Sequence, residues 1–258
     1  YMSYFKKILA AAVIILIAGF TFVYLSERQS DQAVDSVIQG TVPEGPVSAV
    51  KEKNNPIASQ SPVSSPQAAT GISGSVLLDV PFLAQAPFGV WDPLHEDACE
   101  EASLIIAKHF LNQDKNLTPT SGDVEIRKMI NYEKKNGYGI SISLEQLNQI
   151  AKEYLGMQTG RVKYDVTIDD IKKELTAGRP VIVPAAGKIL PNPNFRNGGP
   201  NYHMLVVVGY NQKEFITNDP GTRKGESFRY SFQDLFGAIH DWDENNILNG
   251  QKAYLVFD

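Results

Sequence analysis

The chain has 258 residues, of which 43% are hydrophobic and 21% are charged, and its formal net charge is −5. These values are typical of a globular protein, and a mildly acidic balance without a basic block argues against nucleic acid as a partner. A single cysteine, Cys99, excludes a disulfide framework and a thiolate zinc site.

The N-terminal region has the features of a membrane signal. Lys6 and Lys7 precede an uncharged, largely apolar run at residues 8–25. A membrane span needs about 20 apolar residues, with a range from about 17, whereas the apolar region of a secretory signal usually has about 7–15. The run therefore predicts a transmembrane signal anchor after a short cytoplasmic tail at residues 1–7, with a cleaved signal peptide as the alternative. Because the lysines stay inside, the rest of the chain is expected outside the cytoplasm.

Residues 26–75 differ in composition from the rest of the chain. They are rich in Pro, Ser, Ala, Gln and Thr and contain few large apolar side chains. Such a segment cannot bury enough apolar surface to offset the entropy cost of ordering. We expect a disordered linker that holds a folded domain at residues 76–258 away from the membrane, with a docking tail as the alternative.

The first half of this domain is predicted to be mainly helical. Apolar residues spaced by four, Ala102, Ile106 and Phe110, predict a buried helix. Ser143 begins a capping box and Thr167 is a second N-cap. The expected elements are a short strand at 76–83 that ends at a proline, and helices at 99–112, 121–136, 143–156 and 167–178.

The second half of the domain is predicted to be mainly strand. Its apolar, β-branched runs lie at residues 180–186, 202–210, 214–218, 227–230 and 253–257, with a short helix at 231–239. Helices therefore gather in one half and strands in the other. This segregation is typical of an α+β fold in which the helices pack on an antiparallel sheet, and it argues against an alternating βαβ fold.

Cys99 stands at the first turn of the helix expected over 99–112. Unsatisfied N–H groups and the helix dipole at that position lower the pKa of a thiol and raise the fraction of thiolate, which is the nucleophilic form. The neighbouring carboxylates of Glu100 and Glu101 raise that pKa. The segment alone therefore fits both a buried structural cysteine and a nucleophile that needs a cation nearby.

His203 begins one apolar strand, and Asp219 directly follows the next. A turn at residues 211–213 joins the two strands into a hairpin, which brings His203 across from residues 218–222. An acidic side chain there can orient the imidazole and stabilise its protonated form, as in a nucleophile–histidine–acid constellation. Asn218 is the competing orienting residue, and a simple turn is the alternative interpretation of this segment.

The other three histidines show no comparable pattern. His109 is expected at the surface beside Lys108. His95 and His240 lie in polar contexts with no evident partner. His203 is therefore the candidate general base.

Gln85 lies upstream of Cys99 in an apolar loop. A side-chain amide there, together with the backbone N–H of Cys99, can hold the oxyanion of a tetrahedral intermediate. The alternative is an ordinary loop amide. Along the chain, Gln85 precedes Cys99, which precedes His203 and Asp219. This is the order of papain-type enzymes, in which the cysteine precedes the histidine and the orienting residue.

The chain resembles the C39-like branch of papain-fold cysteine peptidases in four segments: VPFLAQAPFGVW, HEDACEEAS, YHMLVVVGY and FITNDPGT. The resemblance covers residues 76–258 and implies a papain-like fold and thiol acyl-transfer chemistry. Carried over by position, it makes Cys99 the nucleophile, His203 the general base, Asp219 the orienting acid and Gln85 the oxyanion donor. The bacteriocin-leader members commonly have glycine after the cysteine, where this chain has Glu100, so their double-glycine specificity is not transferred.

Together, the residues and the resemblance predict a membrane-anchored, extracytoplasmic cysteine peptidase that needs no metal or organic cofactor. Its substrate is expected to be a peptide or protein, with cell-wall peptide as one option. The alternatives are a transpeptidase or cell-wall peptide amidase of the same fold, an inactive peptide-binding module in which Glu100 suppresses thiolate formation, and a structural domain. Trp91, Phe195, Gly198 and Gly199 are expected to line the cleft, since glycines let an extended peptide approach the backbone.

Overall fold

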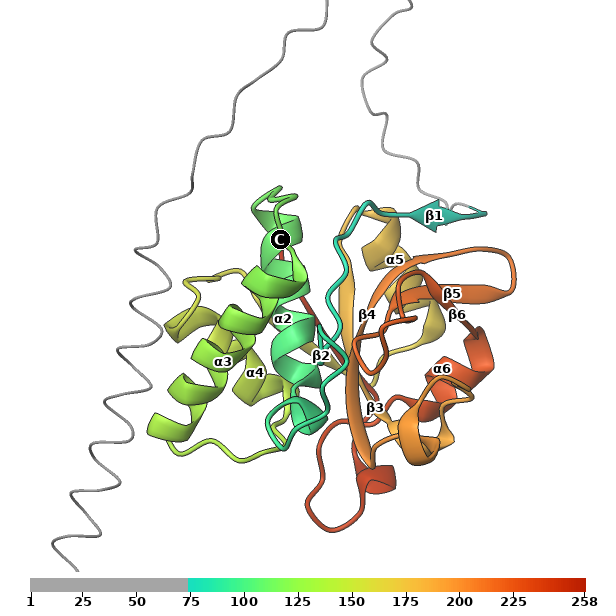
Figure 1. Cartoon of the computed structure of the whole chain (residues 1–258). Helices are drawn as coiled ribbons and strands as arrows, with labels where there is room; N and C mark the ends of the chain where they lie inside the picture. The colour runs from blue at the N-terminus through green and yellow to red at the C-terminus, as the bar shows by residue number, and fades with distance from the viewer. Residues whose placement is uncertain (1–73) are drawn as a thin grey trace, which may run out of the picture. The chain divides into compact units, whose positions relative to one another are not determined.

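The computed structural model of this protein describes residues 74–258, shown in colour in Figure 1. The predicted anchor at residues 8–25 and nearly all of the predicted linker at 26–75 lie outside the described residues. Within residues 74–258, every helix is too short or too polar to cross a bilayer.

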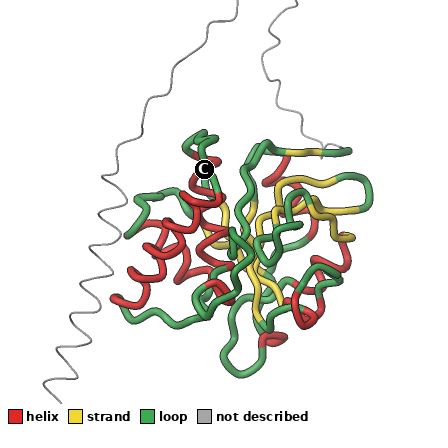
Figure 2. The backbone as a smooth tube through the Cα atoms, viewed as in Figure 1, coloured by secondary structure: helices red, strands yellow, loops and turns green. Residues whose placement is uncertain are grey.

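The described residues form an α+β fold with one antiparallel sheet, as predicted (Figure 2). The strands follow the order β2-β7-β3-β4-β5-β6, and β1 pairs with β4 beside this path. The strands are β1 (Val76–Leu77), β2 (Arg161–Tyr164), β3 (Val181–Ala186), β4 (Tyr202–Tyr210), β5 (Glu214–Asn218), β6 (Phe228–Ser231) and β7 (Ala253–Val256).

Helices cover both faces of the sheet (Figure 1). One face packs against the helices of the first half, α2 (Cys99–Leu111), α3 (Pro119–Lys135) and α4 (Leu144–Glu153). The opposite face packs against α5 (Ile168–Thr176) and α6 (Phe232–Ala238). The predicted packing of helices on an antiparallel sheet is therefore confirmed, with three of the four first-half helices on one face and the fourth, α5, on the other face beside α6.

Side-chain capping sets where four of the helices begin, among them α6, which is capped by Ser231. The predicted capping box at Ser143 is present, with Gln146 as its partner, and Thr167 caps α5. Helix α3 begins two residues earlier than the sequence predicted, because Thr118 is its N-cap and Pro119 occupies the first helical position. Ser121, where the predicted helix began, occupies the third helical position and completes the capping box with Thr118.

Two strands differ from the sequence prediction. Strand β2 was missed because it is a short edge strand in which exposed and half-buried residues alternate. Strand β1 ends at Leu77, well before Pro81, because only Val76 and Leu77 pair with β4. Neither difference changes the topology around Cys99 or His203.

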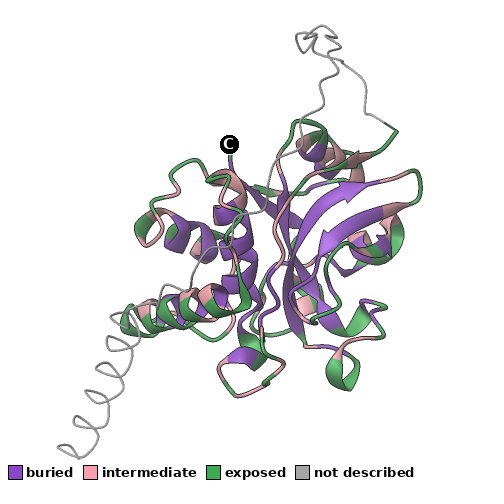
Figure 3. Ribbon diagram, turned by 45° about the horizontal axis from the view of Figure 1, so that its top comes forward, coloured by how far each residue is buried: buried purple, intermediate pink, exposed green. Residues whose placement is uncertain are grey.

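Buried residues gather where α2 packs against the central strands (Figure 3). Every residue of β3 and β4 is buried, as expected for strands covered on both faces. Helix α2 lies between β4 on one side and α3 and α4 on the other, so even its charged residues Glu100 and Glu101 are buried. The first turn of α2 and the beginning of β4 therefore share one low-dielectric environment.

Candidate active site

Cys99 is the first residue of α2 and is 4% exposed. No side chain caps this helix, because Ala98 occupies the N-cap position. The thiol donates a hydrogen bond to Glu100 Oε2 at a distance of 2.9 Å. The backbone of Met204, the residue after His203, also forms a hydrogen bond with the cysteine side chain. The sulfur atom therefore lies against the beginning of β4.

The pKa of the Cys99 thiol is raised well above its ordinary value. Burial is the largest cause, followed by the charge and hydrogen bond of Glu100 and by the charge of Glu101. The hydrogen bond from Met204 acts in the opposite direction and is outweighed. Burial and the charge of Glu101 raise the pKa of Glu100 itself to about 8. Burial and the acidic neighbours together thus override the helix-dipole effect, and the resting cysteine is a thiol.

His203 is fully buried, and its Nε2 lies 2.7 Å from Asp219 Oδ1. The β4–β5 register aligns Val206 with Asn218, which brings His203 level with the turn after β5, as the sequence predicted. Despite complete burial, the pKa of Asp219 is lowered by the charge and hydrogen bond of His203. Because the carboxylate accepts, Nε2 carries the proton, and the second ring nitrogen, Nδ1, is left as an acceptor.

Three further residues hold the Asp219 carboxylate in place. Tyr230 donates to Oδ2 at 2.6 Å, Asn192 donates to the same oxygen at 3.2 Å, and the backbone N–H of Gly221 donates to Oδ1 at 3.0 Å. Sequence reasoning missed Tyr230 and Asn192, which lie on β6 and in the loop after β3. Neither carries a local signal, because only the sheet brings these segments next to Asp219.

Asn218, the competing orienting residue, is used elsewhere. Its side-chain amide donates to the backbone oxygens of Val80 and Pro81, and its oxygen accepts from the N–H of Ser227. It therefore ties the segment after β1 to the end of β5, and His203 is bonded to Asp219 instead.

The imidazole of His203 is packed tightly on one side. The ring of Phe195 meets it edge-on, with 5.3 Å between ring centroids. A Cβ at Gly221 would lie only 2.8 Å from His203 Cε1, so this position has no room for a side chain. His203 Nδ1 is buried and has no hydrogen-bond partner within residues 74–258. An orphaned buried acceptor on an oriented imidazole is a free proton acceptor.

Gln85 makes two hydrogen bonds with its side-chain nitrogen, each 2.9 Å long, to the backbone oxygens of His95 and Glu96. Its backbone N–H donates to the oxygen of Pro220, next to Asp219. The residue thus joins the segment before α2 to the turn that carries the acid. Both amide hydrogens are used in this resting arrangement, while Oε1 is buried without a partner among the described residues.

A groove of about 280 Å³ lies beside Gln85 and the turn that follows Asp219. Gln85 and Gly221 are in its wall, together with Trp91, Phe195 and Gly199 from the set expected to line a cleft. Gly198 is next to this wall in the chain. Arg196 lies over the ring of Trp91, at 5.5 Å from its centroid, and reaches Glu96 across 3.4 Å. The groove is therefore flanked by charged side chains from both sides.

The expectations for the other three histidines were wrong, and His240, like the two described next, has a partner, the backbone oxygen of Gly250 at 2.8 Å. His109 is buried, because α3 covers this side of α2 and Glu125 accepts from His109 Nε2 at 2.9 Å. His95 has two partners, Asp92 at 2.8 Å and Asp123 at 2.7 Å. Asp92 is only three residues from His95, whereas Asp123 and Glu125 lie on α3 and reach the two histidines through the packing of α3 on α2.

Comparisons with known proteins give one family. A family model described as the Peptidase_C39 like family matches residues 77–245. Among solved structures, a protein from Bacillus anthracis proposed to be a C39-like peptidase is 18% identical, with a TM-score of 0.48 over 72% of this chain and 98% of that chain. This structural similarity is too low to support an assignment by itself. No curated protein matches the chain. Because the family model covers more than half of the sequence, the chain belongs to the Peptidase_C39 like family.

Proposed function

We propose that this protein is a papain-like cysteine peptidase that hydrolyses peptide bonds with Cys99 as nucleophile and His203 as general base. The observation that carries the proposal is the buried His203–Asp219 pair, with its 2.7 Å hydrogen bond and its unpartnered Nδ1. A fully buried histidine that is oriented by an ionised acid and offers a free acceptor is what a thiol nucleophile needs. Membership of the Peptidase_C39 like family supports the same conclusion.

In the proposed reaction, His203 Nδ1 takes the proton from Cys99 Sγ, and the thiolate attacks the carbonyl carbon of the scissile bond. Asp219 stabilises the imidazolium that results. The imidazolium then protonates the leaving amine, and the acyl group remains on sulfur. Water, activated by the same nitrogen, adds to the thioester and releases the carboxylic acid and the thiol.

The resting hydrogen bond between Cys99 and Glu100 has to break before this reaction begins. Because the thiol donates to Glu100 Oε2 and His203 Nδ1 has no partner, the sulfur atom must turn from the acid toward the imidazole. Rotation about the Cβ–Sγ bond redirects the thiol hydrogen, and rotation about the Cα–Cβ bond of Cys99 moves the sulfur itself. The raised thiol pKa then makes proton transfer to His203 part of the substrate-bound state rather than of the free protein.

Gln85 is proposed as the oxyanion donor together with the backbone N–H of Cys99. Its side-chain nitrogen now bonds to the carbonyl groups of His95 and Glu96, so it has to release one of them to bind an oxyanion. Its second role, holding the segment before α2, needs no such movement.

One observation favours a different function. A buried thiol whose pKa is raised by Glu100 and Glu101 suits an inactive peptide-binding module. A transpeptidase or a cell-wall peptide amidase would instead use the same residues as the peptidase and differ in the acyl acceptor or the substrate. The reaction products therefore distinguish the transpeptidase and the amidase from the peptidase.

The test is to incubate the protein with a peptide library, quench with acid and measure the mass of the intact protein and of the peptides. The peptidase predicts an acyl adduct on Cys99, cleaved peptides that have gained water, and neither product with Cys99→Ala. Peptides joined to an added amine identify a transpeptidase. If neither an adduct nor cleavage is found and the peptides still bind, the result supports the inactive peptide-binding module.

We also propose that residues 8–25 anchor the domain on the outer side of the membrane. The support is the apolar run after Lys6 and Lys7. Fractionation of cells that express the full chain, followed by protease treatment of intact cells, tests this orientation.

A further inference from the structure

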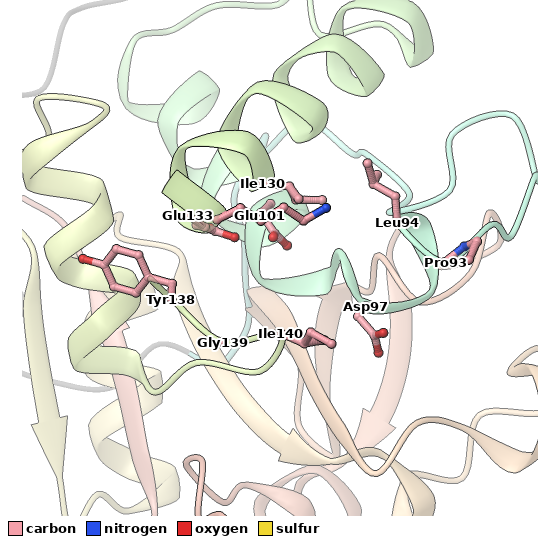
Figure 4. Close-up of a pocket in the computed structure, with 10 residues that line it drawn as sticks. Pro93, Leu94, Asp97, Glu101, Ile130, Glu133, Tyr138, Gly139 and Ile140 are labelled. Atoms are coloured by element: carbon pink, nitrogen blue, oxygen red, sulfur yellow. The ribbon is translucent and has the colours of Figure 1, made fainter. Parts of the chain in front are cut away.

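A second pocket, separate from the groove beside His203, lies at the first turn of α2 (Figure 4). Its volume is about 160 Å³. The walls are mainly apolar, and two glutamates, Glu101 from α2 and Glu133 from α3, are the most buried of its polar groups. The apolar wall consists of Pro93, Leu94, Ile130, Tyr138 and Ile140.

Both glutamates are 4% exposed, and each has one buried oxygen that receives no hydrogen bond from any N–H or O–H group in residues 74–258. Figure 4 shows their carboxyl groups side by side at the pocket. The two groups are close enough to share one proton, and the one other donor to the pair among the described residues is the backbone N–H of Glu101. A carboxyl pair in this state is short of donors and of positive charge.

The described residues supply no cation to this pair. No ion pair of residues 74–258 includes Glu101 or Glu133. Lys134 lines the same pocket, yet it is an exposed residue that pairs with neither. No cluster of three or more metal-binding side chains is present in this part of the chain, so the donor set does not suit a metal ion.

We propose that this pocket binds the primary ammonium group of a lysine-like side chain of the peptide substrate. An ammonium group has three donors on a compact charge, which matches two carboxyl groups from different helices. The aliphatic stem of such a side chain would contact Leu94, Ile130 and Ile140. The ammonium group would take the place of the proton that the glutamates share.

The pocket is next to the groove. Asp97, two residues before Cys99, is in the wall of both. A peptide in the groove can therefore place one side chain in the acidic pocket while its backbone passes Asp97, two residues before Cys99. This role as a specificity subsite rests on the proposed peptidase function, whereas the binding of an ammonium group does not.

Binding is expected to depend on pH, because an ammonium group needs at least one ionised carboxylate. Burial is the main cause that raises the pKa of Glu133, to about 7, and that of Glu101 well above its ordinary value. Affinity should therefore rise as the pH increases through about 7, with release of a proton on binding. The titratable and charged groups that face the pair are Asp97 and Glu100 beside it on the α2 side, Lys134 on α3, and Tyr138.

The experiment is a calorimetric titration of the full 258-residue chain carrying Cys99→Ala, which cannot form an acyl-enzyme. The probes are Nα-acetyl-lysine amide and Nα-acetyl-norleucine amide, which differ only by the ammonium group. At pH 8, the lysine probe is expected to bind at least about tenfold more tightly, a difference expected of one charge-assisted contact. It should lose this advantage at pH 5.5.

Matched variants test whether Glu101 and Glu133 cause the preference for the lysine probe. Glu101→Gln and Glu133→Gln should each remove the preference for lysine, and Lys134→Met should strengthen it by removing a like charge. Glu145→Gln, an exposed acid on α4, should change nothing. Thermal melting confirms that each variant is folded.

Equal binding of the two probes, no detectable binding of the lysine probe, or an unchanged preference in both glutamine variants would overturn the proposal. Because the nucleophile is absent, the outcome is independent of catalysis. Lysine selectivity without peptide cleavage by the unmodified chain would reject the peptidase and keep the pocket.

Discussion

Glu100→Gln is the substitution that most directly tests how Cys99 is kept as a thiol. Glu100 Oε2 accepts the thiol hydrogen bond at 2.9 Å, and both groups are buried. Two unit charges about 4 Å apart interact by about 4 kcal/mol at an effective dielectric constant of about 20, which corresponds to about 3 pKa units. Glu100 carries its charge only above its raised pKa of about 8, where it would oppose a neighbouring thiolate.

Glutamine keeps the shape of this side chain and removes the charge. The pH midpoint of Cys99 alkylation by iodoacetamide is therefore expected to fall by about 1 to 3 units in Glu100→Gln. The midpoint, and not the absolute rate, is the readout, because limited access to the buried sulfur slows the reaction at every pH. Burial still acts in the variant, so its midpoint should remain above that of an exposed thiol.

The control is Glu96→Gln, which removes an exposed acid near the same helix and should leave the midpoint unchanged. An unchanged or higher midpoint in Glu100→Gln would refute this reasoning. It would mean that burial alone, or a group other than Glu100, sets the pKa of Cys99.

Three further predictions concern the residues around the imidazole. Asp219→Asn should lower kcat by about 10²–10⁴, since His203 loses the group that fixes its tautomer. Because the pKa of Asp219 is lowered in the folded protein, its carboxylate stabilises the fold above the unfolded pKa of about 4, and this stabilisation is lost as the pH falls toward the folded pKa. Urea unfolding between pH 6 and pH 3 should therefore be less pH-dependent in Asp219→Asn. Gly221→Ala should lower the free energy of unfolding in urea by about 1–3 kcal/mol and reduce activity, because the new methyl group would lie 2.8 Å from atoms of His203 and Phe195. Wild-type activity in this variant would show that the imidazole ring has room to move. Gln85→Ala should lower the melting temperature, since the backbone carbonyls of His95 and Glu96 lose their hydrogen-bond donor. It should also lower kcat about 10²–10³-fold if Gln85 binds the oxyanion. A lower melting temperature with unchanged kcat would assign Gln85 a structural role alone.

Local patterns in the sequence were sufficient for most of the fold. Capping residues such as Ser143 and Thr167, and apolar spacing along α2, act within one or two turns of a helix and need no tertiary information. The meeting of His203 and Asp219 was also predictable, because the short turn at residues 211–213 brings the far ends of the hairpin together. The bulge between Val207 and Gly209 shifts the register by one residue, which is too little to separate the two side chains.

The parts that could not be predicted depend on contacts between distant segments. Glu133 lies on α3, and nothing in its local sequence indicates a neighbour on α2. The same holds for Tyr230 and Asn192, which reach Asp219 only through the sheet. The sequence also left the net effect on Cys99 open, since the helix dipole and the acidic neighbours oppose each other, and only the degree of burial decides between them.

The measurement that tests the central claim most directly is the rate of peptide cleavage by the unmodified chain, Cys99→Ala and His203→Ala, with His240→Ala as a control. His240 bonds to the backbone oxygen of Gly250 and lines neither pocket. The proposed function predicts cleavage by the unmodified chain and by His240→Ala, and a loss of at least about 10³-fold in kcat/KM in the other two variants. Cleavage that persists in Cys99→Ala or in His203→Ala would contradict it.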